Sequence, residues 1–351
     1  MNAVHVVVPA GIDDPRRPSG GNVYDRHVCR GLAELGWSVR EHPVAGPWPW
    51  PDQAARSGLA EALAAVPDRG LVLLDGLVAS TVPDILQPHR SRLQLVVLLH
   101  MPLGEGDLRA RRVERAALAT AAAVVTPSRW ARRWLLANYG LRPARVQVAE
   151  PGVELPATAP GTSRADSLLC VGAVTPHKGH DVLVAALGEL AGLPWRCVVA
   201  GALDAAPGFV DDLRRRARQH GIAARLDFPG PLTGADLDAA YAGADVLVLA
   251  SRAESYGMVV AEALAYGLPV IATSVGGVPE ALGRAADGRL PGLLVPADDA
   301  PALAAAVRDF LTDGSLRGSL RQAAADRRRR LPQWSHTATR VARALTAAAR
   351  A

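Results

Sequence analysis

The sequence predicts an α/β protein made of two doubly wound domains, each built on a mainly parallel sheet. Short apolar runs of strand length alternate with Ala- and Leu-rich segments of helical spacing along most of the chain. The runs are apolar throughout, which is expected of strands that helices cover on both faces. The length of 351 residues fits two domains of ordinary size.

The candidate strands fall into two sets that a structureless segment separates. They span residues 5–9, 71–75, 94–100 and 123–126, then 168–171, 196–200, 225–228, 246–249, 270–273 and 293–295. Between the sets, residues 151–166 lose periodicity and gain Pro, Gly, Thr and Ser, as linkers do. We therefore expect an N-terminal domain over 1–152, a linker over 153–166 and a C-terminal domain over 167–333. A terminal helix over 334–351 follows Pro332 and is expected to pack back across the domains.

The composition is that of a folded soluble protein. Hydrophobic residues make up 49% of the chain and charged residues 21%. No apolar run reaches the length of about 18 residues that a membrane helix needs, and no basic leader is evident, so we expect a cytoplasmic location. Cys29, Cys170 and Cys197 lie far apart and lack zinc spacing, which predicts reduced, buried thiols.

The net charge of +5 comes from an excess of arginine. Runs at 109–115 and 327–330 are interpreted as solvated helix faces. They lack the aromatic or zinc-finger patterns of nucleic-acid-binding modules, so no nucleic-acid partner is expected. An alternative for the 109–115 cluster is weak peripheral contact with an anionic membrane, helped by Trp130 and Trp134. The spacing of four between these tryptophans fits core packing equally well.

Two glycines follow the first strand, where doubly wound domains often bind ligands. Gly20 and Gly21 open a predicted helix, and the free N–H groups at a helix start suit an anion. A tight turn before the helix is the alternative.

The most informative stretch is LASRAESYGMVVAEALAYGLPVIATSVGGVPEAL in the second half. The strand at 246–249 leads into a loop with Glu254, and a helix begins near Gly257 with Glu262 one turn inside it. Parallel sheets bind ligands beyond the carboxyl ends of their strands, so this loop and helix start face the expected site. A carboxylate can accept two hydroxyl groups at once, which suits a sugar and a ribose.

This pattern of Glu254, Gly257 and Glu262, followed by PVIATSVGGVPE, resembles the signature of the GT-B glycosyltransferases of family 4, the retaining group 1 enzymes. The resemblance covers nearly the whole chain. It implies two Rossmann-like domains that face each other across a cleft, the first binding the acceptor and the second the nucleotide sugar. It also implies retaining transfer of a hexose-type sugar from a nucleoside-diphosphate donor, without metal or other cofactor. The acceptor, a small molecule or a lipid-linked one, is left open.

The resemblance also assigns residues. Glu254 is expected to contact hydroxyls of the donor sugar and Glu262 the ribose. Lys178, in the loop after 168–171, is expected to meet the diphosphate. The family usually has an arginine five positions earlier, where this chain has Ala173, so Arg252 or His177 would have to compensate, or the donor binds differently. The implied catalytic residues are Glu254, Lys178 and His100, and the donor-binding residues are Gly20, Gly21, Leu232, Arg252, Ser255, Tyr256, Gly257, Met258, Val259 and Glu262.

The first half contributes two polar residues at strand ends. His100 closes the run 94–100, and a similar family position carries a histidine near the reacting sugar, although a structural role is the alternative. Asp75 ends the strand in LVLLDG and is either an acceptor contact or an Asp-Gly turn residue. Asp298 and Asp299 fit a helix start better than a metal pair, so no metal site is expected. Two rivals to the glycosyltransferase remain: a nucleotide-sugar epimerase and a sugar-nucleotide-binding protein without turnover.

Overall fold

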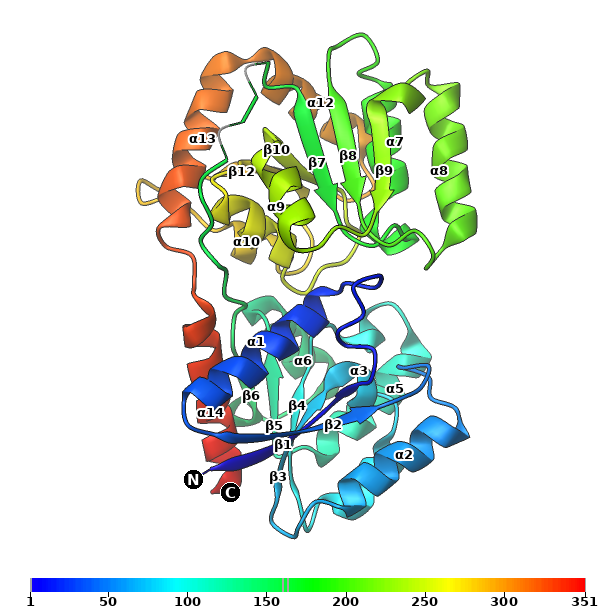
Figure 1. Ribbon diagram of the computed structural model, residues 1–351, viewed down its shortest axis with the longest axis vertical. Coiled ribbons are helices and arrows are strands. Elements are labelled where there is room, and N and C mark those ends of the chain that lie inside the picture. The colour runs from blue at the N-terminus through cyan, green and yellow to red at the C-terminus, as the bar shows by residue number, and fades with distance from the viewer. Residues whose placement is uncertain (1, 160, 163, 351) are drawn as a thin grey trace. The chain divides into compact units, whose positions relative to one another are not determined.

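The computed structural model describes residues 2–159, 161–162 and 164–350, which form two compact units. The first unit takes in the chain up to Asp14, Gly20–Gly152 and the chain from Pro332 onward; the second takes in Pro15–Ser19 and Val153–Leu331. Each contains a six-stranded parallel sheet with helices around it (Figure 1). Both units are Rossmann-like, which confirms the predicted fold class.

The sheet of the first unit has the strand order β2-β1-β3-β4-β5-β6, and every pairing in it is parallel. The central strands β3, β4 and β5, which are buried except for the first residue of β4, match the apolar runs of the sequence to within two residues. The strands are β1 (Ala3–Pro9), β2 (Ser38–Val44), β3 (Leu71–Asp75), β4 (Gln94–Leu98), β5 (Ala123–Thr126) and β6 (Val146–Val148).

The two edge strands of this sheet, β2 and β6, were not among the predicted strands. The sequence of β2 is SVREHPV, and most of its side chains are exposed or half-buried. An edge strand pairs on one side only and tolerates charges and proline, so it lacks the apolar run that marks a central strand. Strand β6 has only three residues, too few to show a pattern.

The C-terminal helix α14 packs beside α1 in the first unit (Figure 1). A Cβ added to Gly31 would lie 2.5 Å from the Cβ of Ala338, so a glycine is needed where the two helices cross. The Thr337 hydroxyl donates to the carbonyl of Glu150 at 2.7 Å. The helices of this unit are α1 (Gly20–Glu34), α2 (Gln53–Ala64), α3 (Gly76–Ala79), α4 (Pro83–Leu86), α5 (Leu108–Thr120), α6 (Arg129–Tyr139) and α14 (Trp334–Ala349).

The sheet of the second unit has the order β12-β11-β10-β7-β8-β9. Its strands are β7 (Ser167–Val171), β8 (Arg196–Ala200), β9 (Leu226–Gly230), β10 (Val246–Leu249), β11 (Val270–Thr273) and β12 (Gly292–Val295). Strand β9 runs two residues beyond the predicted strand 225–228 and so includes Pro229 and Gly230. The helices are α7 (His180–Gly188), α8 (Pro207–Gln219), α9 (Gly234–Ala242), α10 (Met258–Ala265), α11 (Val278–Leu282), α12 (Ala300–Thr312) and α13 (Gly314–Arg328).

The described part of the expected linker is fastened to the second unit. The buried carboxylate of Asp245 accepts hydrogen bonds from the backbone N–H of Thr162 at 2.8 Å, from its hydroxyl at 2.6 Å and from Arg321 at 2.6 Å. Arg328 donates to the carbonyls of Pro156 and Ala265. A buried carboxylate is stable only when hydrogen-bonded and balanced by charge, so Asp245 fixes this segment firmly.

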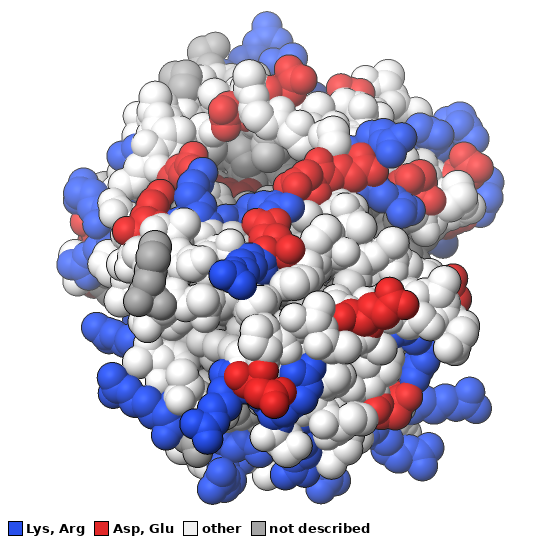
Figure 2. Space-filling view, turned by 60° about the horizontal axis from the view of Figure 1, so that its bottom comes forward, with Lys and Arg blue, Asp and Glu red and all other residues white. Residues whose placement is uncertain are grey.

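Basic side chains do not gather in a single patch on the face shown in Figure 2, where they alternate with acidic and uncharged ones. Trp134 on α6 packs against the apolar core of its unit, and the Arg111 guanidinium lies over its ring, 5.4 Å from the centroid. Core packing therefore accounts for this tryptophan. The three cysteines are buried thiols, as predicted. Among the helices that the structure describes, none is long and apolar enough to cross a bilayer.

Candidate active site

Two loops of the second unit meet where its strand order reverses. The chain runs outward from β7 through β8 to β9 and then returns to place β10 on the other side of β7. Open parallel sheets bind ligands beyond the carboxyl ends of the two strands at such a switch point. Lys178 lies in the loop after β7, and Glu254 lies in the loop after β10. The topology therefore brings together two of the predicted catalytic residues.

Lys178 and Glu254 form a direct ion pair. The Lys178 ammonium donates to Glu254 Oε1 at 2.5 Å, and the Ser251 hydroxyl donates to the same oxygen at 2.8 Å. Glu254 is 8% exposed. A buried carboxylate with a single cationic partner keeps that cation in place, so the pair holds an ammonium group at the carboxyl end of the sheet.

Glycines allow these loops to approach each other. Gly179 has φ +66°, and a Cβ on it would lie 1.9 Å from the carbonyl oxygen of Ala250. Gly276 has φ +53°, and a Cβ there would lie 1.7 Å from the carbonyl oxygen of Glu254. The next residue, Gly277, donates its N–H to that carbonyl at 2.9 Å. The glycines of the TSVGGVPE stretch thus position the backbone of Glu254.

We expect Gly179→Ala to destabilise the second unit more than Gly221→Ala does. Both glycines have a positive φ, 66° and 70°, but Gly221 has no atom within 4 Å of an added Cβ. The control therefore carries only the left-handed backbone strain, about 1–2 kcal/mol, whereas Gly179→Ala adds a clash of about 1–3 kcal/mol. Denaturant unfolding midpoints measure the difference. Equal losses would contradict the inferred contact with Ala250.

Glu262 lies on α10, five residues after the helix N-cap Gly257. Its Oε2 accepts a hydrogen bond from the Tyr241 hydroxyl at 2.8 Å, and the Tyr241 ring stacks on Tyr266 with centroids 4.9 Å apart. Burial raises the pKa of the Glu262 carboxyl, and the Tyr241 hydrogen bond opposes this shift. The helix start thus places an acidic side chain with one oxygen already oriented by a tyrosine.

The expected substitutes for an arginine at position 173 are used elsewhere. Both Nη atoms of Arg252 donate to Asp181, at 2.9 and 2.8 Å, and its Nε donates to Asp298 at 2.6 Å. Desolvation, followed by the neighbouring Lys178, lowers the pKa of His177, so this ring is neutral near pH 7. Asp181 and Asp298 therefore balance the charge of Arg252. Lys178 is the cation that pairs with Glu254 at the switch point.

Most of the remaining predicted donor-binding residues lie around the start of α10, and the others lie after β9 and in α1. Ser255, Tyr256 and Gly257 are buried in the loop that leads into α10; Met258 and Val259 are half-buried in its first turn; Leu232 is half-buried after β9. Gly20 and Gly21 form the first turn of α1 in the first unit. Asp299 caps α12 by accepting from the N–H of Ala302 at 2.8 Å, which agrees with the helix-start interpretation of Asp298 and Asp299.

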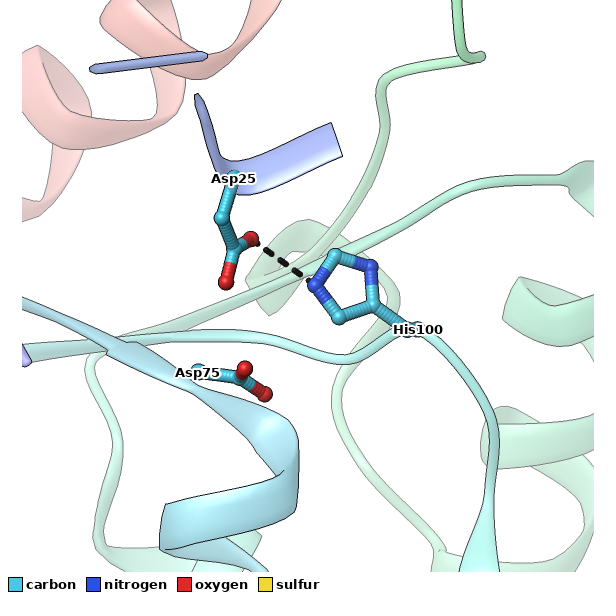
Figure 3. Close-up of side chains that lie close together, drawn as sticks. All are labelled: Asp25, Asp75 and His100. Carbon is cyan, nitrogen blue, oxygen red and sulfur yellow. Dashed lines mark hydrogen bonds and ion pairs between the residues drawn. The ribbon is translucent and has the colours of Figure 1, made fainter. Parts of the chain in front are cut away.

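A second polar cluster lies in the first unit, at the switch point between β1 and β3 (Figure 3). Asp75 follows the turn interpretation: its Oδ1 caps α3 by accepting from the N–H of Leu77 at 2.7 Å. His100 lies two residues beyond β4, and its Nε2 is 2.8 Å from Asp25 Oδ1. The three side chains of Asp25, Asp75 and His100 therefore converge from α1, β3 and the loop after β4.

These three residues also offer a donor set that metal ions accept. One ligand atom from each lies within 4.8 Å of the others. His100 Nε2 and Asp25 Oδ1, two of these three ligand atoms, already share a proton in a hydrogen bond. A metal ion would have to displace that proton. The geometry therefore favours a shared proton over a metal.

Two functional signals were missed from the sequence. The first is Asp25, which lies inside α1, where the sequence does not distinguish it from an acidic residue on a solvent-facing helix surface. The available clue was its spacing of one helical turn from Gly21. Lys178 is the one lysine among 39 Lys and Arg residues. A chain that otherwise uses arginine for positive charge has a lysine only here, and this exception was a clue that an ammonium group differs from a guanidinium at this position.

Two Rossmann-like units in one chain are the architecture of the GT-B class of glycosyltransferases. The family comparisons agree. A model for Glycosyltransferase Family 4 matches residues 18–156, and one for Glycosyl transferases group 1 matches residues 162–327. The two matches together span most of the sequence, and the chain belongs to the group 1, family 4 glycosyltransferases.

Curated relatives match part of the chain. A protein named D-inositol 3-phosphate glycosyltransferase from Kineococcus radiotolerans is 35% identical over 219 residues, which cover 56% of this chain and 50% of that protein. A protein of the same name from Mycobacterium tuberculosis is 35% identical over 173 residues, 45% of this chain and 35% of the relative. The matched region thus spans half or less of these relatives.

Solved structures share the fold over nearly the whole chain. Sucrose-phosphate synthase from Thermosynechococcus elongatus superposes with a TM-score of 0.77 at 22% identity and covers 98% of both chains. Anabaena HepE in complex with UDP-glucose gives a TM-score of 0.78 at 16% identity, over 99% of this chain and 100% of that one.

Proposed function

We propose that this glycosyltransferase moves a hexose-type sugar from a nucleoside-diphosphate donor to a hydroxyl acceptor with retention of configuration. The observation that carries the proposal is the Lys178–Glu254 ion pair at the switch point of the second unit, with Glu262 on the adjoining helix. An ammonium group suits a diphosphate, and two carboxylates suit the hydroxyls of a sugar and a ribose. The acceptor is a small molecule or a lipid-linked one.

In the proposed reaction the bond between the sugar C1 and the diphosphate oxygen breaks as the acceptor oxygen forms a bond to C1 on the same face. The acceptor proton passes to the departing phosphate oxygen. Lys178 and the backbone N–H groups at the start of α10 stabilise the negative charge that grows on the diphosphate. Glu254 orients the sugar and Glu262 the ribose, so catalysis rests on positioning and electrostatics.

A donor screen tests the proposal. UDP-glucose is the first probe because HepE was solved with it, and GDP- and ADP-sugars follow. A rise in melting temperature identifies the donor, and mass spectrometry of reaction mixtures with candidate acceptors identifies the product. Binding with neither transfer nor donor hydrolysis would favour the sugar-nucleotide-binding alternative. A donor converted to its epimer would favour the epimerase.

We expect Glu262→Ala to weaken binding of the bare nucleoside diphosphate about 10- to 100-fold. The variant removes the acceptor for the ribose hydroxyls and leaves the buried Tyr241 hydroxyl without its partner. Calorimetric titration with UDP, or with the diphosphate of the donor found in the screen, measures the change. Tyr241→Phe is the matched control, since it removes only the internal hydrogen bond. Unchanged affinity in folded Glu262→Ala would contradict the ribose assignment.

We expect turnover to persist in excess EDTA. Side-chain and helix-start charges replace the metal that other transferases use for the leaving diphosphate. Initial rates with and without chelator give the answer. A loss of rate that manganese or magnesium restores would contradict the metal-free mechanism.

A further inference from the structure

One face of α1 surrounds the ring of His100. Gly21, Tyr24 and Asp25 are spaced three and four apart, so they lie on the same side of the helix. A Cβ on Gly21 would lie 3.0 Å from His100 Cδ2, so the missing side chain makes room for the ring. The Tyr24 ring meets it edge-on with centroids 5.2 Å apart, and Asp25 Oδ1 lies 2.8 Å from Nε2.

The charges around this ring are buried. Asp25 is 2% exposed and Asp75 is 3% exposed. Asp25 Oδ2 is buried and makes no hydrogen bond to any part of the chain that the structure describes. A buried carboxylate requires a counter-charge, and the His100 ring, which is charged when both its nitrogens are protonated, lies within hydrogen-bonding distance of Asp25.

Asp75 takes up a proton more readily than a usual aspartate. Burial, and after it the nearby Asp25, raise the pKa of its carboxyl well above the usual range. A carboxyl group that takes up a proton more readily repels its buried neighbour less, so this shift eases the close approach of Asp75 to Asp25.

Opposing effects act on the pKa of the His100 ring. Burial lowers the pKa of His100, and the positive end of the α1 helix also disfavours a cation there. The charge of Asp25, its hydrogen bond and the charge of Asp75 outweigh burial and raise the pKa of His100 to about 9. Asp25 and Asp75 are thus the charged neighbours that raise the pKa of the ring.

We propose that Asp25 is a positioning residue that holds His100 as a doubly protonated imidazolium, whose second ring nitrogen donates a hydrogen bond during sugar transfer. In Figure 3 that nitrogen points away from Asp25. His100 then serves as a donor and a positive charge, and it does not take the acceptor proton. This role rests on the proposed function, and it fits a reaction in which the leaving phosphate accepts that proton.

The charge state of His100 can be tested without measuring enzyme activity. Two-dimensional ¹H–¹⁵N spectra of the ligand-free protein distinguish doubly protonated from neutral rings, and His100→Gln identifies the signal among nine histidines. In the wild type we expect both nitrogens to stay protonated through neutral pH and to lose a proton only near pH 9. A neutral His100 ring at about pH 7.5 overturns the proposal. Broadening of the His100 signal by one equivalent of Mn²⁺, reversed by EDTA, overturns it in favour of a metal site.

Two variants separate the roles of the carboxyl groups. We expect Asp25→Asn to move the His100 titration to a pH about two to three units lower, and Asp75→Asn, its matched control, to move it less because Asp75 is not hydrogen-bonded to the ring. An equal or larger shift in Asp75→Asn overturns the assignment. The wild-type spectrum alone decides the charge state if Asp25→Asn fails to fold.

The reaction provides the second readout. At saturating donor and about pH 8 we expect Asp25→Asn to lower kcat about 10- to 100-fold with little change in the donor KM, and kcat to recover as the pH falls toward about 6. A fall in rate that is independent of pH would indicate a purely structural role and contradict the proposal. If the spectra show the imidazolium but no donor is turned over, the proposed function fails and the charge assignment stands.

Discussion

Lys178→Ala should lower turnover at saturating donor about 100- to 1,000-fold, which is the usual cost of removing a donor aimed at developing negative charge. The effect is expected at the upper end of that range because Ala173 supplies no second cation and Arg252 is held by Asp181 and Asp298. Lys178→Arg should retain part of the rate, since a guanidinium reaches phosphate with a different geometry. Steady-state kinetics of the purified variants test this.

Ala173→Arg is the converse test of the same site. Where the loop has room, an added arginine should tighten binding of the nucleoside diphosphate. Near-normal turnover in Lys178→Ala would show that the diphosphate binds elsewhere. Because Lys178 pairs with Glu254, its variants need a check that Glu254, left without its cation, has not destabilised the loop. Thermal melting of each variant provides it.

Glu254→Ala should lower kcat/KM about 100-fold while leaving affinity for the bare nucleoside diphosphate within a few-fold of the wild type. The carboxylate is expected to accept hydroxyls of the sugar, which the bare diphosphate lacks, and hydrogen bonds to charged groups contribute about 1.5–3 kcal/mol each. Calorimetry with UDP and with UDP-glucose, compared side by side, separates the two contributions. Glu262→Ala should weaken both ligands and serves as the contrasting variant.

The double variant Lys178→Ala with Glu254→Ala adds a check on the pair. Residues in direct contact are expected to show non-additive effects, so the double variant should lose less than the product of the single losses. Equal loss of affinity for UDP and UDP-glucose in Glu254→Ala would place the carboxylate near the nucleotide and contradict the sugar contact.

The sequence predicts the buried central strands of this fold well and its exposed edge strands poorly. Central strands such as β10 and β11 are buried along their whole length, so their apolar runs are unmistakable. The edge strand β2 is mostly exposed, and its sequence is that of a polar loop. Pairing with β1 is a long-range property that composition does not encode.

The candidate site divides in a similar way. Glu254 and Lys178 are recognisable because each follows a predicted buried strand and matches the pattern of the family that the sequence resembles. Asp25 was not identified, because its spacing from Gly21 is a weak clue and its main distinction is the approach of His100 from a segment 75 residues away. The role of Arg252 depends on Asp181 and Asp298, which only the folded chain brings within hydrogen-bonding distance.

The solitary lysine has a practical consequence for chemical labelling. Reagents that acylate or alkylate primary amines find one side-chain target in this chain, at position 178. That amine is held against Glu254 and is only 23% exposed, so it should react slowly until the pair opens. Reductive methylation with labelled formaldehyde would turn this amine into a dimethylamine, whose methyl signal is the one side-chain signal beside that of the α-amino group and would report donor binding. Amine-directed immobilisation, by contrast, would tether or block the enzyme through the group on which its turnover is expected to depend.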